Sequence, residues 1–164
     1  MDAAAFSPMY FSWLDVLARL GAASLLSLAI GIERFVRRKP VDFRPFLIVS
    51  LASSALIIGL IEASFAIRDP RLSIDPGRVM SGVMTGVGFL GAGALFREKH
   101  IVQGAGSAAA FWAAGAIGIV CGLGLLWLGA LLAGGILLLF LAGRPFTETY
   151  DARMSDEARG DNGH

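Results

Sequence analysis

Long apolar stretches separated by short polar segments dominate the pattern along the chain. The longest, residues 104–143, contains no Asp, Glu, Lys or Arg. As one helix it would be about 60 Å long at 1.5 Å per residue, roughly twice the thickness of the hydrocarbon core of a bilayer. The stretch must therefore turn once, and Gly122-Leu123-Gly124 is the expected place because glycine readily interrupts helices. This pattern predicts an integral membrane protein.

The pattern as a whole predicts an all-α, polytopic transmembrane helical bundle of about five spans. Pro45 and the Asp75-Pro76 pair fit helix starts, since proline is tolerated in the first turn and aspartate is a good N-cap. Helices are expected because lipid requires every backbone polar group to be paired internally. The predicted spans cover about residues 13–32, 45–63, 76–96, 104–121 and 125–142.

One transmembrane domain, residues 1–144, accounts for most of the chain. Residues 145–164 are polar and mixed in charge, which predicts a disordered cytoplasmic tail. The first basic residue is Arg19. No positively charged segment therefore precedes the first apolar stretch, and we do not expect a cleaved signal peptide.

Lysine and arginine in the loops predict the orientation, because basic loops stay in the cytoplasm. The loop after the first predicted span holds Arg34, Arg37, Arg38, Lys39 and Arg44. The loop after the third span adds Arg97 and Lys99, and the tail begins with Arg144. The opposite side holds Arg68, Arg71 and Arg78. This distribution predicts an N-terminus outside and a C-terminus inside.

Composition excludes several other classes of protein. Charged residues make up 16% of the chain, against about 25% in ordinary globular domains. A net charge of +1 gives no reason to expect a nucleic-acid partner. The single cysteine, Cys121, excludes an internal disulfide framework. The sequence contains no Ser-His-Asp or Cys-His arrangement and no phosphate-binding loop, so we expect neither an enzyme nor a cofactor.

Glycines 86, 88 and 91 match the GxGxxG spacing of dinucleotide-binding loops. That motif requires a preceding strand and an acidic residue about 20 positions on, whereas here the glycines lie in an apolar span and the later sequence reads SAAAFWAA. Small residues in membrane helices allow close packing, which is the favoured interpretation; a helix break lining a pathway is the alternative. The expected packing residues are Gly82, Gly86, Gly88, Gly91, Gly93, Gly104, Trp112, Gly115, Gly118 and Gly122.

Two segments, MSGVMTGVGFLGAGALFRE and GAGSAAAFWAAGAIGIVCGLG, resemble the signature of the MgtC/SapB family of membrane proteins. Further matching elements are Arg19, Gly31–Arg34, Arg44, and Asp75-Pro76 with Arg78. Together the matches extend over most of residues 17–124. The chain departs from the pattern at Gly82, where glutamine is common, and at residues 106–109. The resemblance implies a short form without the C-terminal cytoplasmic domain of longer members.

The resemblance also implies a function and a location. It points to a bacterial inner (plasma) membrane protein of magnesium homeostasis, an accessory factor at low magnesium and, in pathogens, in survival inside host cells. Such a factor would act by modulating other membrane proteins. The alternative is a transporter of magnesium or another cation. The expected partners are the lipid bilayer and other membrane proteins, with a homo-oligomer as a further alternative, because small-residue faces also drive self-association.

Ionisable residues in or beside spans are functional candidates, because charge is costly in a membrane. Arg19 is expected to pair with Asp15 or, alternatively, to contact another helix near Asp75. A cytoplasmic cluster is expected to form either an interfacial ion-pair network or a site for a partner or an anionic headgroup. The candidate residues are Arg19, Glu33, Arg34, Arg44, Asp75, Arg78, Arg97 and Glu98. Magnesium needs oxygen ligands, but each acid near a span has a basic neighbour, so the sequence assigns no metal site.

Overall fold

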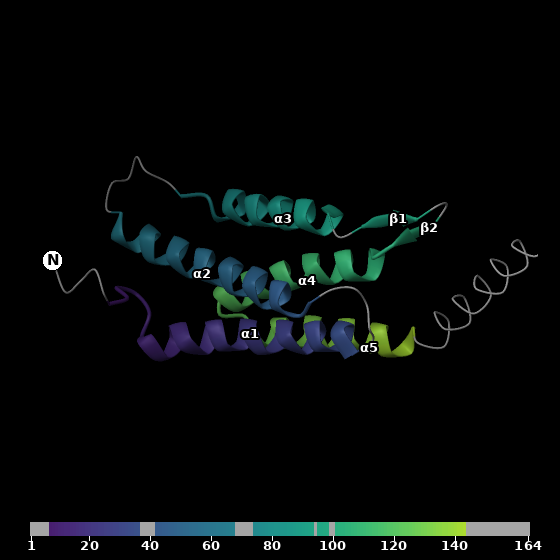
Figure 1. The fold of residues 1–164 in the computed structure, drawn as a ribbon. Coiled ribbons are helices and arrows are strands. Elements are labelled where there is room, and N and C mark those ends of the chain that lie inside the picture. Colours follow the sequence, from purple (N-terminus) through teal and green to yellow (C-terminus); the bar gives the residue numbers. More distant parts are fainter. Residues whose placement is uncertain (1–6, 37–41, 68–73, 94, 99–100, 144–164) are drawn as a thin grey trace, which may run out of the picture.

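The computed structural model describes residues 7–36, 42–67, 74–93, 95–98 and 101–143. Within them the chain forms five helices and one short hairpin (Figure 1). The elements are α1 (Trp13–Val36), α2 (Arg44–Ala66), α3 (Pro76–Gly93), β1 (Phe96–Glu98), β2 (Ile101–Gln103), α4 (Ala105–Gly122) and α5 (Leu126–Ala142). The predicted helical class is confirmed, with the hairpin as an addition. The predicted tail, residues 145–164, lies outside the described residues.

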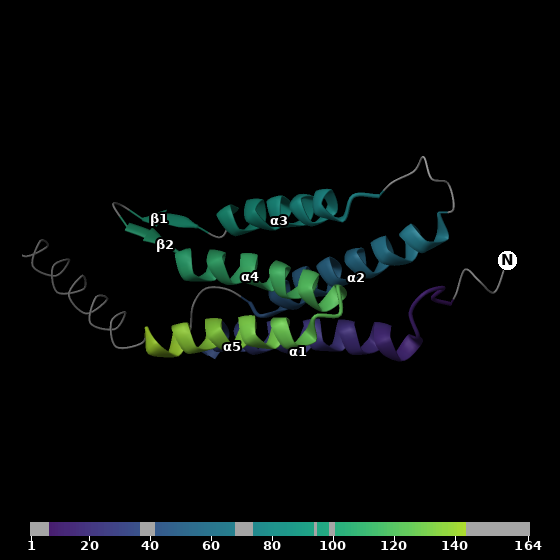
Figure 2. The same ribbon diagram turned by 180° about the vertical axis from the view of Figure 1, so that it is seen from behind.

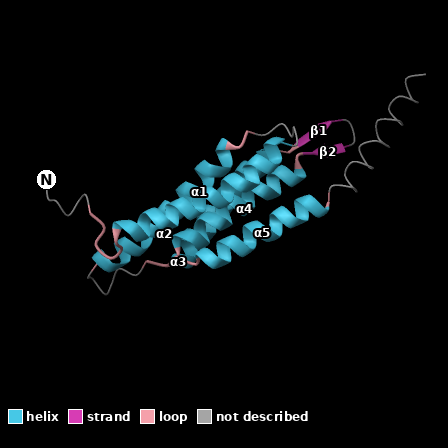
Figure 3. Cartoon of the chain, turned by 90° about the horizontal axis from the view of Figure 1, so that it is seen from below, coloured by secondary structure: helices cyan, strands magenta, loops and turns pink. Residues whose placement is uncertain are grey.

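The helices lie side by side in an elongated bundle, with the hairpin at one end (Figure 3). α3 forms one outer layer, α2 and α4 the middle, and α1 and α5 the opposite layer (Figures 1 and 2). α4 packs against each of the other four helices. It is therefore the central helix of the bundle.

α1 begins at the predicted residue but ends later than predicted. Ser12 caps it: its Oγ accepts the Asp15 N–H at 3.1 Å, while the Asp15 carboxylate accepts the Ser12 N–H and O–H. This reciprocal arrangement is a capping box. The helix then continues to Val36, so Glu33 and Arg34 lie within its last turn. The predicted span ended near residue 32, so the helix extends about one turn beyond it.

α3 ends earlier than predicted. Its last residue is Gly93, and Phe96 instead begins β1, which pairs antiparallel with β2, Phe96 opposite Gln103. Gly91 and Gly93 lower the helical propensity of this segment by about 1 kcal/mol each relative to alanine. The predicted continuation of the helix to residue 96 was therefore wrong.

The closest helix contact joins α4 to α2. A Cβ at Gly118 would collide with the Ser50 carbonyl oxygen, and one at Gly122 would lie 2.8 Å from the Ser54 carbonyl oxygen. Only glycine permits such an approach of two backbones. Beside this contact, the rings of Phe46 and Phe111 stack with centroids 4.4 Å apart.

The glycines of α3 are less tightly packed than those of α4. A Cβ at Gly91 would lie 3.2 Å from the Ala108 carbonyl oxygen, and one at Gly115 of α4 would lie 3.1 Å from Val87. Four glycines of α3 instead have open space where a side chain would be: Gly82, Gly86, Gly88 and Gly93. The described residues therefore do not pack against them.

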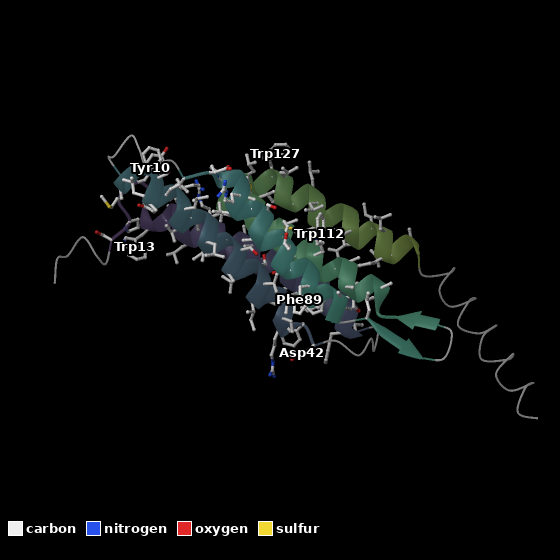
Figure 4. All side chains as sticks on the ribbon, turned by 90° about the horizontal axis from the view of Figure 1, so that it is seen from above. Tyr10, Trp13, Asp42, Phe89, Trp112 and Trp127 are labelled. Atoms are coloured by element: carbon white, nitrogen blue, oxygen red, sulfur yellow. The ribbon has the colours of Figure 1, made fainter. Side chains whose placement is uncertain are left out.

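Two further residues that were expected to pack between helices, Gly104 and Trp112, lie elsewhere in the structure. Gly104 is the N-cap of α4 and has a φ of 90°, so it serves a turn that favours glycine. Trp112 is 52% exposed and lies on the surface of the bundle with Trp127 and Phe89 (Figure 4). The expectation that Trp112 packs on a small-residue surface was wrong.

α1, α2 and α4 are long and apolar enough to cross a membrane, and α5 is a shorter apolar helix. Large apolar side chains cover the exterior, including Trp13, Phe89 and Leu139, which are 58%, 81% and 72% exposed. Apolar exteriors of this extent are rare in soluble monomers. The chain is a membrane protein.

Candidate functional site at the two ends of the central helix

Two arginines of α1 contact opposite ends of α4. Arg19 and Arg34 are separated by about 22 Å along a helix at 1.5 Å per residue. α4 has 18 residues and is therefore about 27 Å long. Because α1 and α4 run in opposite directions, Arg19 reaches the C-terminal end of α4 and Arg34 its N-terminal end. We name these the Arg19 end and the Arg34 end of the bundle.

Arg19 is held by a carbonyl group and an aromatic ring. Its Nη1 donates a 2.6 Å hydrogen bond to the Gly122 carbonyl oxygen, and its guanidinium carbon lies 4.1 Å from the centroid of the Phe11 ring. The last carbonyls of a helix lack partners within the helix and carry the negative end of its dipole. The cation therefore stabilises the C-terminus of α4.

Gly124 makes room for this arginine. Its φ is +85°, and a Cβ there would lie 2.8 Å from Arg19 Nη2. Side chains rarely adopt such a φ, so the backbone conformation favours glycine here, and the absence of a side chain leaves room for the guanidinium. The turn predicted at residues 122–124 is thus also the place where Arg19 docks.

Neither expected partner of Arg19 forms a described hydrogen bond or ion pair with it. Asp15 bonds to Ser12 in the capping box. Asp75 accepts the N–H of Gly77 at 2.9 Å, at the start of α3. The alternative of a contact with another helix describes Arg19 better, but that contact is with a carbonyl group of α4.

Arg34 is buried, with 7% of its surface exposed. Its Nε donates a 2.6 Å hydrogen bond to Glu33 Oε2, and its guanidinium carbon lies 3.6 Å from the centroid of the Phe140 ring. A Cβ at Gly106 would lie 3.2 Å from its Nη1. Arg34 thus joins α1, α4 and α5 at one point.

The electrostatics of the Arg34 end differ from those of the Arg19 end. The N-terminus of a helix carries the positive end of its dipole, which disfavours a cation. Glu33 offsets this, because its carboxylate pairs with the guanidinium and both side chains are only 9% exposed. A buried pair of this kind depends on both partners, since removing one leaves the other charge uncompensated.

The remaining predicted site residues do not join this pair in the described contacts. Arg44 is exposed and makes a 3.4 Å ion pair with Asp42, and Arg78 is exposed in the first turn of α3. Arg97 and Glu98 lie on β1, at the end of the bundle where α1 and α5 end (Figure 1), and their side chains are outside the described set. Among the predicted site residues whose side chains the structure describes, an ion pair joins Glu33 to Arg34.

The described residues contain no group of three or more His, Cys, Asp or Glu that could hold a metal ion. Four acids have protein partners. Glu33 pairs with Arg34, Asp15 with Ser12, Asp75 with Gly77, and Glu62 with the N-terminal segment. In these contacts the carboxylates fix helices and turns.

A model of the MgtC family matches residues 20–149. The chain belongs to the MgtC family. It is 32% identical to Protein SapB of Bacillus subtilis over 71% of the present chain. It is 35% identical to Protein MgtC of Salmonella typhimurium over 63% of the present chain. An uncharacterized protein of Haemophilus influenzae is 31% identical over 89% of the chain.

The chain spans about half the length of the MgtC-family relatives it matches: 52%, 41% and 62% of these three proteins. No solved structure matches it significantly.

Sequence reasoning did not assign a role to Glu62, which anchors the segment before α1. Its carboxylate accepts the backbone N–H groups of Met9, Tyr10 and Phe11 at 2.8, 3.1 and 3.0 Å. The Tyr10 ring stacks on Phe65 with centroids 3.9 Å apart. The aromatic residues Tyr10 and Phe11, close before Trp13, are a signal that could have indicated an ordered segment here.

Proposed function

We propose that this MgtC-family protein is a five-span protein of the bacterial inner membrane that modulates other membrane proteins and thereby supports adaptation to low magnesium. It would be neither an enzyme nor a transporter, with its N-terminus outside and its C-terminus inside. The observation that carries the proposal is a face of α3 that consists of small residues and is not covered by the described residues.

This face, the small face of α3, consists of Ser81, Thr85, Gly88 and Ala92. Their spacing of four, three and four residues places them on one side of a helix. Ser81, Thr85 and Ala92 are exposed and Gly88 is half-buried. Small residues let membrane helices approach closely, and serine and threonine form hydrogen bonds across such contacts. The face therefore suits a transmembrane helix of a partner.

The orientation and the number of spans are supported by the charge distribution. The loop between α1 and α2 holds more basic residues than the loop between α2 and α3, which favours the former in the cytoplasm. α5 is apolar throughout its 17 residues. Together with α3 it would complete a bundle of five spans, which carries the hairpin and the C-terminus to the cytoplasmic side.

The alternative is a transporter of magnesium or another cation, which would require carboxylates available to a hydrated ion. The acids Asp15, Glu33, Glu62 and Asp75 are instead engaged with protein groups. The contact between α2 and α4 at Gly118 also leaves no space between their backbones. These contacts favour a structural role for the charges and a partner-binding role for the surface.

The test combines in-cell photocrosslinking with growth at low magnesium. A photoreactive amino acid at Phe89, beside the small face and 81% exposed, should capture a different membrane protein. Gly88→Leu should abolish both the capture and the growth at low magnesium at unchanged membrane abundance. Gly135→Leu is the matched control, because Gly135 is exposed on α5 with open space around it.

Two outcomes would count against the proposal, and a third tests the separate cytoplasmic site predicted from the sequence. Capture of only a second copy of this chain would favour a homo-oligomer. Capture and growth unaffected by Gly88→Leu would remove the small face as the partner site. The predicted site at Glu33 and Arg97 would be excluded if Glu33→Gln and Arg97→Gln both support growth at low magnesium.

A further inference from the structure

A groove of about 360 Å³ lies between α2 and α3. Its walls are formed by Ile48, Val49 and Leu56 of α2 and by Val83, Val87 and Leu90 of α3, and it presents no polar surface. It opens to the exterior of the bundle, on a different side of α3 from the small face. In a membrane this opening faces lipid.

The groove exists because α3 approaches α4 rather than α2. Gly91 and Val87 contact α4, whereas Gly82 and Gly86 line the groove, and a Cβ at either glycine would meet no described atom within 4 Å. These two glycines are one turn apart on the same face of α3. They widen the groove along its length without closing it.

Basic residues stand at both ends of the groove. Arg44 precedes Ile48 by four residues and Arg78 precedes Gly82 by four, so each lies one turn beyond the lining and on the same helix face. Both are exposed. The ion pair of Arg44 with Asp42 is long and solvent-exposed, and such pairs contribute little, so its guanidinium is available to a phosphate group, which arginine binds in bidentate fashion.

The length and the lining of the groove suit an acyl chain. The lining from Gly82 to Leu90 extends about 12 Å along α3 at 1.5 Å per residue. The groove of about 360 Å³ presents only apolar surface. Half the hydrocarbon core of a bilayer is about 15 Å thick, so a lipid tail can run along the groove with its headgroup at one end.

We propose that the groove binds an acyl chain of an anionic phospholipid whose phosphate contacts Arg44. Arg44 is favoured over Arg78 because Arg37, Arg38 and Lys39 precede it in the sequence, which makes this segment the more basic of the two. Asp69 and Asp75 accompany Arg78. The bound lipid would fill the space between α2 and α3 and hold α3 in place.

Native mass spectrometry of the purified full chain with phosphatidylglycerol and phosphatidylcholine tests this assignment. Gly86→Leu, which fills the groove, should abolish retained lipid, and Gly135→Leu on α5 should not. Arg44→Gln should lower the affinity for phosphatidylglycerol about fivefold, the change expected for about 1 kcal/mol per arginine at a membrane surface. Arg78→Gln should leave it unchanged. Retention of phosphatidylglycerol by Gly86→Leu, or a loss with Arg78→Gln instead of Arg44→Gln, would overturn the assignment.

A second measurement applies even if Gly86→Leu fails to fold. In a chain with its three tryptophans replaced by phenylalanine, a tryptophan at Leu56 in the groove should be quenched by phosphatidylglycerol brominated on its acyl chains. The quenching should exceed that of a tryptophan at Leu131, which is 65% exposed on α5. Equal quenching would show ordinary lipid contact only. A dimer that Gly86→Leu dissociates would show that a second copy occupies the groove.

Discussion

The contact between α2 and α4 and the gap between α2 and α3 involve glycines of the same spacing but opposite surroundings. Gly118 and Gly122 meet the backbone of Ser50 and Ser54. Gly82 and Gly86 instead line an open groove, and its α2 wall includes small as well as bulky residues: Ile48, Ala52, Ser53 and Leu56. A glycine pair at this spacing therefore does not by itself indicate close helix packing.

The same contrast extends to charge. In the half of the molecule around α4, which we call the closed half, Arg19 and Arg34 both bind protein groups at the ends of that helix. The α3 half presents a small face, a groove and exposed arginines. We infer that the closed half provides stability and the open half meets other molecules.

Arg34→Met should have the largest effect on the closed half. It leaves the buried Glu33 carboxylate without its guanidinium, and breaking a buried ion pair costs about 3–5 kcal/mol. Thermal unfolding in detergent should show a large loss of stability. Combining it with Glu33→Gln should recover part of the loss, because the carboxylate that lost its guanidinium is then removed as well. No recovery would mean that the contact with Phe140, rather than the ion pair, is what Arg34 provides.

Gly118→Ala compared with Gly86→Ala tests the two helix contacts directly. The added methyl group at residue 118 would collide with the Ser50 carbonyl oxygen, so we expect a loss of about 1–3 kcal/mol, as for overpacked cores. At residue 86 the space is open, and alanine should be neutral or gain up to about 1 kcal/mol in helical propensity. Equal unfolding temperatures for the two variants would contradict the difference in packing between the glycines of α4 and those of α3.

Gly124→Ala should cost less, about 1–2 kcal/mol, the typical penalty for a left-handed residue with a side chain. Gly135→Ala on α5 is the control, because its surroundings are open. If Gly124→Ala were as stable as Gly135→Ala, the left-handed backbone at residue 124 would not be required for the turn.

The sequence predicted the helix starts well and the helix ends less well. Pro45 and Asp75-Pro76 mark two predicted starts with local chemistry, whereas the cap formed by Ser12 and Asp15 at the start of α1 was not predicted. The end of α1 was missed because Glu33 and Arg34 resemble a polar loop, whereas their mutual pairing lets the helix continue past them. The local sequence pattern does not reveal that two charged side chains pair with each other within a helix.

The contacts at the two ends of α4 depend on residues that are distant in the sequence. Arg19 meets Gly122, and Arg34 meets Gly106 and Phe140. The sequence placed Arg19 inside the first predicted span and Arg34 in the loop after it, and marked both as candidates. Their partners follow from how α1, α4 and α5 pack. The sequence also did not predict that α2 packs closest to α4, because serines and glycines occur in several helices and would allow more than one pair of helices to pack closely.

Reconstitution of the purified protein in liposomes with a magnesium-sensitive dye inside tests most directly whether it acts on other membrane proteins or moves ions itself. We predict that external Mg²⁺ enters at the rate of protein-free liposomes, with and without a membrane potential. Saturable, protein-dependent entry of Mg²⁺ would contradict the proposed function and establish a transporter.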